Sequence, residues 1–407
     1  MLAGPRGLCF DGVMRVLFST TAGTGHFGPL VPVARACRDA GHTVAVAAPA
    51  SFAGQVHNAG LTHVALPDTP AEKTAPIFAR LPTLPRLEAN RLAWSELFGR
   101  LHAQTAVMAL LEVLPRWRPD VVVREPCEFG SLVAAERLGI PQVQVAIGVS
   151  QLLAAAAPWL QDPVAELEAR VGLSPPRGVG LLLSQPTLTC VPATFDRARG
   201  DSSTEAEGDG RVWRFRSTSP ATGPAVPGTW GDPSWPLVYV TFGSVVANHG
   251  WFDQLFSAML EVLAPLPVRV LMTTGTGFEP SRLDPLPSNA WVAPWWPQEA
   301  AMAATSVIIG HGGFGTTMIA LAAGVPQIVM PLFSFDQFLN AERLQAVGAG
   351  VQLPGGLAAV ADVPSIVSEF LSTDRYAAVA RTIADEIAQL PEVATIVEVI
   401  DKLRNDR

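Results

Sequence analysis

The sequence predicts an α/β protein built from two doubly wound domains that face each other across a cleft. Short β-branched and aliphatic runs alternate with helix-length segments along the chain, which is the pattern of parallel sheets covered by helices. A stretch rich in proline, glycine and acidic residues over 201–236 divides these runs into two series. A length of 407 residues is too great for one ordinary domain and suits two.

The predicted strands define the two domains. The first series comprises 15–20, 43–48, 63–67, 120–125, 142–147 and 188–193. The second series comprises 237–244, 268–274, 290–295, 306–311, 326–331 and 350–353. We expect a disordered extension, an N-terminal domain, a linker and a C-terminal domain, over 1–13, 14–218, 219–236 and 237–385. Such sheets bind ligands at the carboxyl ends of their strands, which is where two facing domains form a cleft.

Composition excludes several classes of protein. Lys and Arg number 28 against 36 Asp and Glu, a formal net charge of −8, which gives no electrostatic basis for binding nucleic acid or an anionic membrane. The 4 cysteines are scattered, without metal-ligand spacing, which favours a reducing cytoplasm. No apolar run reaches transmembrane length without interruption, and the first residues lack the apolar core of a signal peptide.

A first glycine motif follows the first predicted strand. Gly23, Gly25 and Gly28 match the G-x-G-x-x-G fingerprint of dinucleotide-binding proteins. The full fingerprint also needs an acid near the end of the second strand to hold the ribose hydroxyls. No acid occurs over 43–51, so an NAD or FAD oxidoreductase is the weaker alternative.

The same loop carries His26, and the fourth predicted strand ends at Glu125. Because the carboxyl ends of parallel strands share one edge, these two side chains can meet. A carboxylate bonded to one imidazole nitrogen fixes the tautomer and raises the basicity of the other, as in a catalytic dyad. A structural histidine and a solvated acid are the alternative, and Glu128 is a second candidate partner.

A second glycine motif, IIGHGGFGTTM over 308–318, reads as a strand, a tight turn and a helix start. The first N–H groups of a helix lack internal partners and carry partial positive charge, which suits an anion. Thr316 adds a hydroxyl donor, and no lysine follows as in a Walker loop. The motif therefore favours a diphosphate bound without lysine or metal, with a close-packed strand-to-helix turn as the alternative.

Polar and aromatic residues flank this motif. Trp295 and Gln298 come at the end of the preceding strand, and a Trp face can stack on a nucleobase, although core Trp is more common. Asp336 and Gln337 follow the next strand and could hold sugar hydroxyls, with an ordinary helix cap as the alternative role of Asp336. No D-x-D metal motif is present, so no metal is expected.

These elements, in this order and spacing, resemble the donor-binding signature of family 1 glycosyltransferases, and Gly25-His26-x-x-Pro29 resembles their acceptor-side loop. The closest likeness is to bacterial enzymes that glycosylate macrolide, polyketide or enediyne metabolites. The resemblance implies a GT-B fold of two Rossmann-like domains, with acceptor bound by the N-terminal and nucleotide-sugar by the C-terminal domain. It also implies that a helix over 386–407 packs back on the N-terminal domain.

The resemblance further implies a role for each site residue. His26 would be the general base of an inverting transfer, oriented by Glu125 where aspartate is usual. Trp295 would stack on the base and Gln298 would lie beside the ribose. The remaining contacts would be made to the diphosphate by Ser244, His311, Gly313 and Thr316, and to the sugar by Asp336 and Gln337. No cofactor is implied beyond the nucleotide-sugar co-substrate.

Ile319 distinguishes between donors. Members that use UDP-sugars typically carry glutamate eight positions after the motif histidine, where it bonds the ribose hydroxyls; here that position is Ile319. An apolar residue tolerates a 2′-deoxyribose, whereas a buried unpaired carboxylate would be costly. The sequence therefore predicts a dTDP-sugar, with a deoxysugar as its cargo. A UDP-sugar enzyme of the same fold and a nucleotide-sugar epimerase are the alternatives.

The acceptor is the least determined feature. The stretches 76–103 and 149–161 are apolar and contain aromatic residues, so they could line a pocket for a hydrophobic aglycone. Core packing explains them nearly as well. The oligomeric state is open, with a homodimer among the alternatives.

Overall fold

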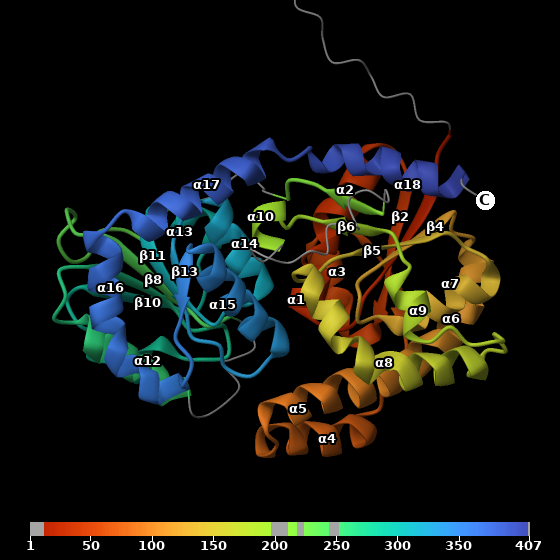
Figure 1. Ribbon diagram of the computed structural model, residues 1–407, viewed down its shortest axis with the longest axis horizontal. Helices are drawn as coiled ribbons and strands as arrows, with labels where there is room; N and C mark the ends of the chain where they lie inside the picture. The colour runs from red at the N-terminus through yellow and green to blue at the C-terminus, as the bar shows by residue number, and fades with distance from the viewer. Residues whose placement is uncertain (1–11, 197–210, 218–223, 244–251, 406–407) are drawn as a thin grey trace, which may run out of the picture.

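The computed structural model describes residues 12–196, 211–217, 224–243 and 252–405 as two parallel sheets with helices on both faces (Figure 1). Ser244, predicted to contact the diphosphate, lies outside the described residues. One sheet has the strand order β3-β2-β1-β4-β5-β6-β7 and the other β10-β9-β8-β11-β12-β13. In each sheet the order reverses beside the first strand, so the switch point that binds ligands in such sheets occurs in both domains.

The N-terminal sheet is built from buried, β-branched runs, because both of its faces are covered by helices. Its strands are β1 (Arg15–Ser19), β2 (Thr43–Pro49), β3 (Thr62–Leu66), β4 (Val121–Arg124), β5 (Gln142–Val145), β6 (Thr187–Thr189) and β7 (Val212–Arg214). Its helices are α1 (Thr24–Phe27), α2 (Leu30–Asp39), α3 (Ala53–Asn58), α4 (Ala71–Arg80), α5 (Arg86–Leu92), α6 (Ala103–Trp117), α7 (Phe129–Leu138), α8 (Ser150–Arg170), α9 (Val179–Leu183) and α10 (Ala193–Asp196).

All strands predicted in the first series are present, with ends shifted by up to two residues except that β6 ends at Thr189, four residues before the predicted end, but β7 was not expected. It falls within 201–236, whose composition is that of a linker. A strand of 3 residues is too short to show an alternating pattern. Its tertiary contacts define it instead: Trp213 packs against the domain core, and Arg214 forms an ion pair with Asp196 at 3.0 Å.

A single continuous helix runs over 86–117, from α5 through the π-helical segment η3 (Ala93–His102) into α6. By length and apolar composition alone it is long enough to cross a membrane. One face of the helix packs within the domain, however, since Leu97, Val107 and Leu110 belong to a core cluster, whereas Met108 is exposed. A buried core helix meets the same criterion of length and composition.

The C-terminal domain repeats the architecture, and every strand of the second predicted series is found. The strands are β8 (Leu237–Thr241), β9 (Arg269–Thr273), β10 (Ala290–Ala293), β11 (Thr305–Gly310), β12 (Gln327–Val329) and β13 (Gly350–Gln352). The helices are α12 (Phe252–Leu263), α13 (Gln298–Met302), α14 (Phe314–Ala322), α15 (Phe335–Val347), α16 (Val363–Ser372) and α17 (Arg375–Gln389).

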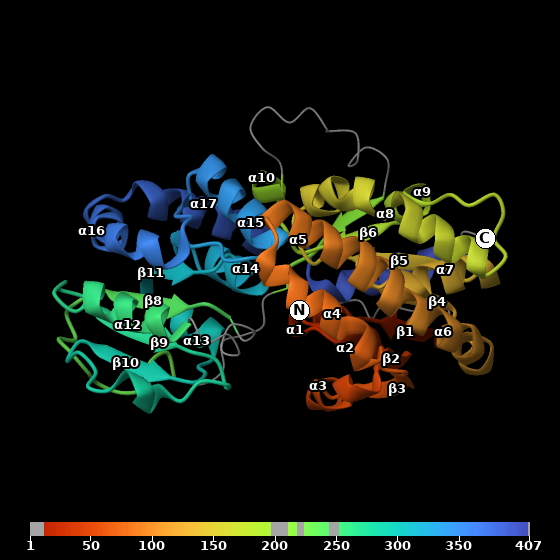
Figure 2. The same cartoon turned by 90° about the horizontal axis from the view of Figure 1, so that it is seen from below.

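The end of the chain returns to the N-terminal domain, as Figure 1 shows for α18 (Ile396–Asn405). Ile396, Val397 and Ile400 of this helix are buried in the N-terminal core cluster that also contains Val33 of α2. Burying these side chains removes apolar surface from water and fastens the two domains together. Figure 2 shows the same two-lobed arrangement from below, with α5 at the border between the lobes.

Candidate active site

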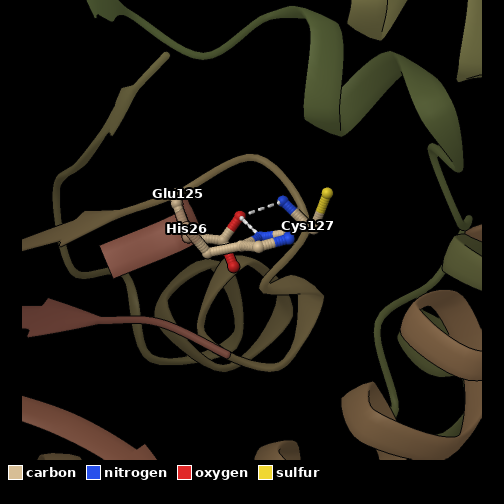
Figure 3. A group of neighbouring side chains, drawn as sticks. All are labelled: His26, Glu125 and Cys127. Atoms are coloured by element: carbon tan, nitrogen blue, oxygen red, sulfur yellow. Dashed lines mark hydrogen bonds and ion pairs between the residues drawn. The ribbon is translucent and has the colours of Figure 1, made fainter. Parts of the chain in front are cut away.

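The site on the N-terminal domain is an ion pair between His26 and Glu125. His26 lies in α1, which directly follows β1, and Glu125 directly follows β4. These strands are neighbours in the sheet, with Ser19 paired to Arg124, so their carboxyl ends bring the two side chains together. His26 Nδ1 lies 3.1 Å from Glu125 Oε2 (Figure 3).

Backbone and hydroxyl donors hold the Glu125 carboxylate in place. Its Oε1 accepts from the N–H and the hydroxyl of Thr21, at 3.2 Å and 3.0 Å, and its Oε2 accepts from Cys127 N–H at 2.6 Å. Burial raises the pKa of Glu125, but the His26 charge and these hydrogen bonds outweigh it, so the net pKa shift is downward. The group therefore remains a carboxylate at neutral pH.

The same contacts act on His26. Burial lowers its pKa, whereas the Glu125 charge, the bond to Glu125 and the more distant Asp336 raise it, and the net pKa shift is upward. The His26 side chain keeps 23% of its surface exposed, while that of Glu125 is fully buried. Since Nδ1 faces Glu125, Nε2 is the nitrogen that can take a proton from a bound substrate.

Glu128, the other candidate partner of His26, has a different role. Its Oε2 accepts from Ser131 N–H at 2.9 Å, which caps the first turn of α7. Burial raises the pKa of this carboxyl group, with the Ser131 and Ser19 hydrogen bonds opposing. The structure therefore pairs His26 with Glu125 and assigns Glu128 to the helix end.

Among the described residues, the ligand atoms of His26, Glu125 and Cys127 lie within 4.8 Å of one another and could in principle hold a metal ion. A cysteine binds metal as a thiolate. Burial and the charge of Glu125 raise the pKa of Cys127 well above its usual value, which opposes the thiolate. Figure 3 also shows the sulfur turned away from the ion pair, so this group fits a metal poorly.

The second glycine motif forms the turn between β11 and α14, with Gly313 as the N-cap. The His311 ring occupies a slot between two glycines: a Cβ on Gly313 would lie 2.4 Å from its Nε2, and one on Gly243 would lie 2.8 Å from its Cε1. Burial lowers the pKa of His311 to about 4. This histidine is therefore uncharged at neutral pH, beside the unpartnered N–H groups that open α14.

Trp295 and Gln298 follow β10, as the sequence indicated. Trp295 is 64% exposed, so the alternative of a core tryptophan is wrong. Its neighbour Trp296 packs against a core cluster of the C-terminal domain, and the indole N–H of Trp296 donates to Pro224 O at 3.2 Å. The Thr316 hydroxyl donates to Gln298 Oε1 at 3.1 Å, so two residues predicted to bind the nucleotide-sugar are hydrogen-bonded to each other.

The predicted sugar-binding pair divides into two roles. Asp336 is half-buried in the first turn of α15 and accepts a hydrogen bond from the Ser334 hydroxyl. Gln337 is buried, and its Oε1 accepts from Leu332 and Phe333 N–H at 2.9 Å and 3.1 Å. The oxygen of Gln337 therefore shapes the loop, and a sugar contact falls to Asp336 or to the Gln337 nitrogen.

Ile319 is half-buried on α14 and packs against the core cluster that contains Ala301 and Met302 of α13. The same helix carries the diphosphate motif, and α13 begins with Gln298. Ile319 thus belongs to the packing between the two helices that present the predicted donor contacts.

A cavity of about 220 Å³ lies at the ends of β5, β6 and β7, and its lining includes Pro126, the residue that follows Glu125. One side is apolar, with Trp94, Pro126 and Ile147 among its lining, and the other is polar, with Gln144 and Arg214. Sequence reasoning had singled out 76–103 and 149–161 as acceptor-pocket candidates, and both contribute to this lining. The sequence did not predict that β7 also lines the cavity, with Val212 and Arg214.

The aromatic contacts of His26 were also missed. The Phe98 ring lies 5.3 Å from the His26 ring, and it also contacts Trp94 and His102, at 6.4 Å and 5.8 Å between ring centroids. The signal was present in the sequence, because these aromatic side chains recur every four residues along one helix and so share a face.

Two family models match the chain: residues 35–195 match the N-terminal domain and residues 258–403 the C-terminal domain of the erythromycin biosynthesis protein CIII-like family. The chain is 32% identical over 395 residues to the L-demethylnoviosyl transferase of Streptomyces niveus, covering 95% of this chain and 97% of that protein.

Solved structures agree. The spinosyn rhamnosyltransferase SpnG complexed with thymidine diphosphate is 26% identical, with a TM-score of 0.75 over 95% of this chain and 100% of that chain. The calicheamicin glycosyltransferase CalG4 is 21% identical, with a TM-score of 0.79 over 97% and 99%, and shares the fold. The expected GT-B architecture is confirmed. The chain therefore belongs to the erythromycin biosynthesis protein CIII-like family and is a glycosyltransferase of antibiotic biosynthesis.

Proposed function

We propose that this glycosyltransferase moves a deoxysugar from a dTDP-sugar to a hydroxyl group of a hydrophobic natural-product aglycone, by inverting displacement in the cytoplasm. The observation that carries the proposal is the contact of His26 with the buried Glu125, on the same domain as a cavity that is lined by Pro126, the next residue in the chain. A histidine with a raised pKa and one free nitrogen is a suitable general base for a hydroxyl group.

The reaction proceeds in one displacement. His26 Nε2 takes the proton of the acceptor hydroxyl while its oxygen forms a bond to the anomeric carbon. The bond from that carbon to the diphosphate oxygen breaks, and dTDP leaves with the electron pair. The charge of Glu125 stabilises the imidazolium that forms, and the proton then passes to solvent.

The leaving diphosphate is stabilised without a metal ion in this proposal. The N-terminus of α14 and neutral His311 supply hydrogen-bond donors for the developing negative charge. The Thr316 hydroxyl, which donates to Gln298 Oε1 in this structure, would turn to the diphosphate when the donor binds. We therefore expect full turnover in excess EDTA, measured by release of dTDP. Loss of turnover that Mg²⁺ or Mn²⁺ restores would contradict the metal-free mechanism.

The choice of dTDP rests on Ile319 and is supported by the thymidine diphosphate bound in the related SpnG structure. The test is calorimetric binding of dTDP and UDP to the wild type, to Ile319→Glu and to Ile319→Leu. We expect the wild type and Ile319→Leu to prefer dTDP, and Ile319→Glu to shift the ratio toward UDP by about tenfold, or about 1.4 kcal/mol. A wild type that prefers UDP would contradict the dTDP donor.

A further inference from the structure

One face of the long helix over 86–117 contacts both halves of the active site. Arg86, Asn90, Trp94, Phe98 and His102 follow one another at intervals of four residues, so they lie along the same side. Phe98 packs on the ring of His26, and Trp94 lines the acceptor-side cavity. Arg86 and Asn90 contact residues of the C-terminal domain.

Asn90 makes three side-chain hydrogen bonds, two of which reach the C-terminal domain. Its Oδ1 accepts from Phe335 N–H at 2.9 Å, and its Nδ2 donates to Phe333 O at 3.2 Å and to Arg86 O at 2.8 Å. The side chain is buried, with 7% of its surface exposed. Asn90 thus pairs with the backbone on both sides of Ser334, and its oxygen and its nitrogen are both engaged.

The segment it holds leads directly to the predicted sugar-binding residue. Asp336 follows Phe335 in the chain, and the Ser334 hydroxyl donates to its carboxylate. Packing reinforces the hydrogen bonds: the Phe335 ring lies 5.4 Å from the Trp159 ring, and the Arg86 guanidinium lies 3.8 Å from the Phe338 ring centroid. A segment of the donor domain is therefore docked on the acceptor domain.

We propose that Asn90 is a positioning residue for the donor sugar, which fixes the segment 333–336 so that Asp336 faces the sugar. The inference rests on the proposed function, because it takes Asp336 to contact the sugar. It goes further by placing part of the control of sugar orientation in the acceptor domain. Nucleotide and diphosphate contacts lie elsewhere and do not depend on Asn90.

The chemistry of asparagine explains why this residue type is needed. Alanine removes the acceptor for Phe335 N–H and the donor to Phe333 O, which leaves both backbone groups without these partners. Leucine fills a similar volume but offers neither group. Aspartate keeps an acceptor for Phe335 N–H but turns a charged oxygen toward the carbonyl oxygens of Phe333 and Arg86.

The first test is hydrogen–deuterium exchange without ligand. In Asn90→Ala and Asn90→Leu we expect amide exchange to quicken by about 5- to 10-fold in the peptide that contains Phe335, and to stay unchanged over β8 to β11. Ser95→Ala is the matched control, since the Ser95 hydroxyl on the same helix bonds only within it, to Arg91 O at 2.8 Å. Unchanged exchange in the peptide that contains Phe335 would contradict the role of the Asn90 contact. Faster exchange in that peptide alone would distinguish local release of the segment from unfolding of the domain.

The second test separates the sugar from the nucleotide. Calorimetry with dTDP and with dTDP-glucose gives the affinity that the sugar adds. We expect Asn90→Ala and Asn90→Asp to bind dTDP as the wild type does but to lose about tenfold of the added affinity. Equal loss for both ligands, or no loss, would overturn the positioning role. If the wild type binds UDP and not dTDP, the donor proposal has failed, and UDP with UDP-glucose gives the same comparison.

Discussion

The two halves of the active site differ in how they use charge. The acceptor side pairs the partly exposed His26 with the buried carboxylate of Glu125, and this contact raises the pKa of His26 and lowers that of Glu125. The diphosphate side presents a neutral histidine, a hydroxyl group and the start of a helix. The difference suits the chemistry that we propose for each half. A neutral hydroxyl must be deprotonated by a tuned base, whereas the leaving diphosphate is already charged and needs hydrogen-bond donors.

The two halves are also assembled differently. His26 and Glu125 are far apart in sequence, and only the pairing of β1 with β4 brings them together. The predicted diphosphate motif is one continuous turn, and its Gly313 forms one wall of the space around His311, while Gly243, after β8, forms the other. Substitutions on the acceptor side should therefore change the chemical step and its pH dependence. Substitutions in the glycine turn should change the binding of the nucleotide.

His26→Ala is expected to have the largest effect. It removes the proposed general base, and such groups are typically worth about 10²- to 10⁴-fold, so turnover should fall by roughly that factor. The affinity for dTDP, measured by calorimetry, should stay unchanged because His26 belongs to the other half. His57→Ala is the control, since His57 is exposed on α3 away from the ion pair. Full activity of His26→Ala would contradict the assignment of the base.

Glu125→Gln is expected to have an intermediate effect and to show it in the pH profile. The free base is the active form of His26, so kcat/KM rises with pH through its pKa, which Glu125 raises. Without that charge, burial dominates and lowers the pKa, so the acid limb should move to lower pH by about 1–3 units while the weaker base slows turnover.

Two further variants make the pH result decisive. Glu125→Asp keeps the charge, and aspartate is the usual residue at this place in the resembling family, so its acid limb should stay closer to that of the wild type. Glu128→Gln alters the cap of α7 and should lower the melting temperature without moving the limb. If the acid limb of the pH profile moved in Glu128→Gln and not in Glu125→Gln, the result would contradict the pairing of His26 with Glu125 in the structure.

How much the sequence could predict depended on whether a feature is local. Buried strands can be recognised in the sequence as β-branched runs. The glycine turn, and the position of His26 at the carboxyl edge of the sheet, can also be predicted from adjacent residues. The strand β7 and the exposure of Trp295 depend on what packs beside them, which no local pattern records. Asn90 contacts residues more than two hundred positions away, so only the contact between the two domains shows its role.

Gly313→Ala is expected to have the smallest effect, on nucleotide binding alone. The added Cβ would lie 2.4 Å from His311 Nε2, so the ring must leave its slot, at a cost of roughly 1–3 kcal/mol for overpacking. The affinity for dTDP should fall by about tenfold, while the pH profile of His26 is unchanged. Gly315→Ala is the matched control in the same turn, because a Cβ there meets nothing within 4 Å. If both variants weaken dTDP equally, close approach of the backbone to the diphosphate, and not the position of His311, controls nucleotide binding.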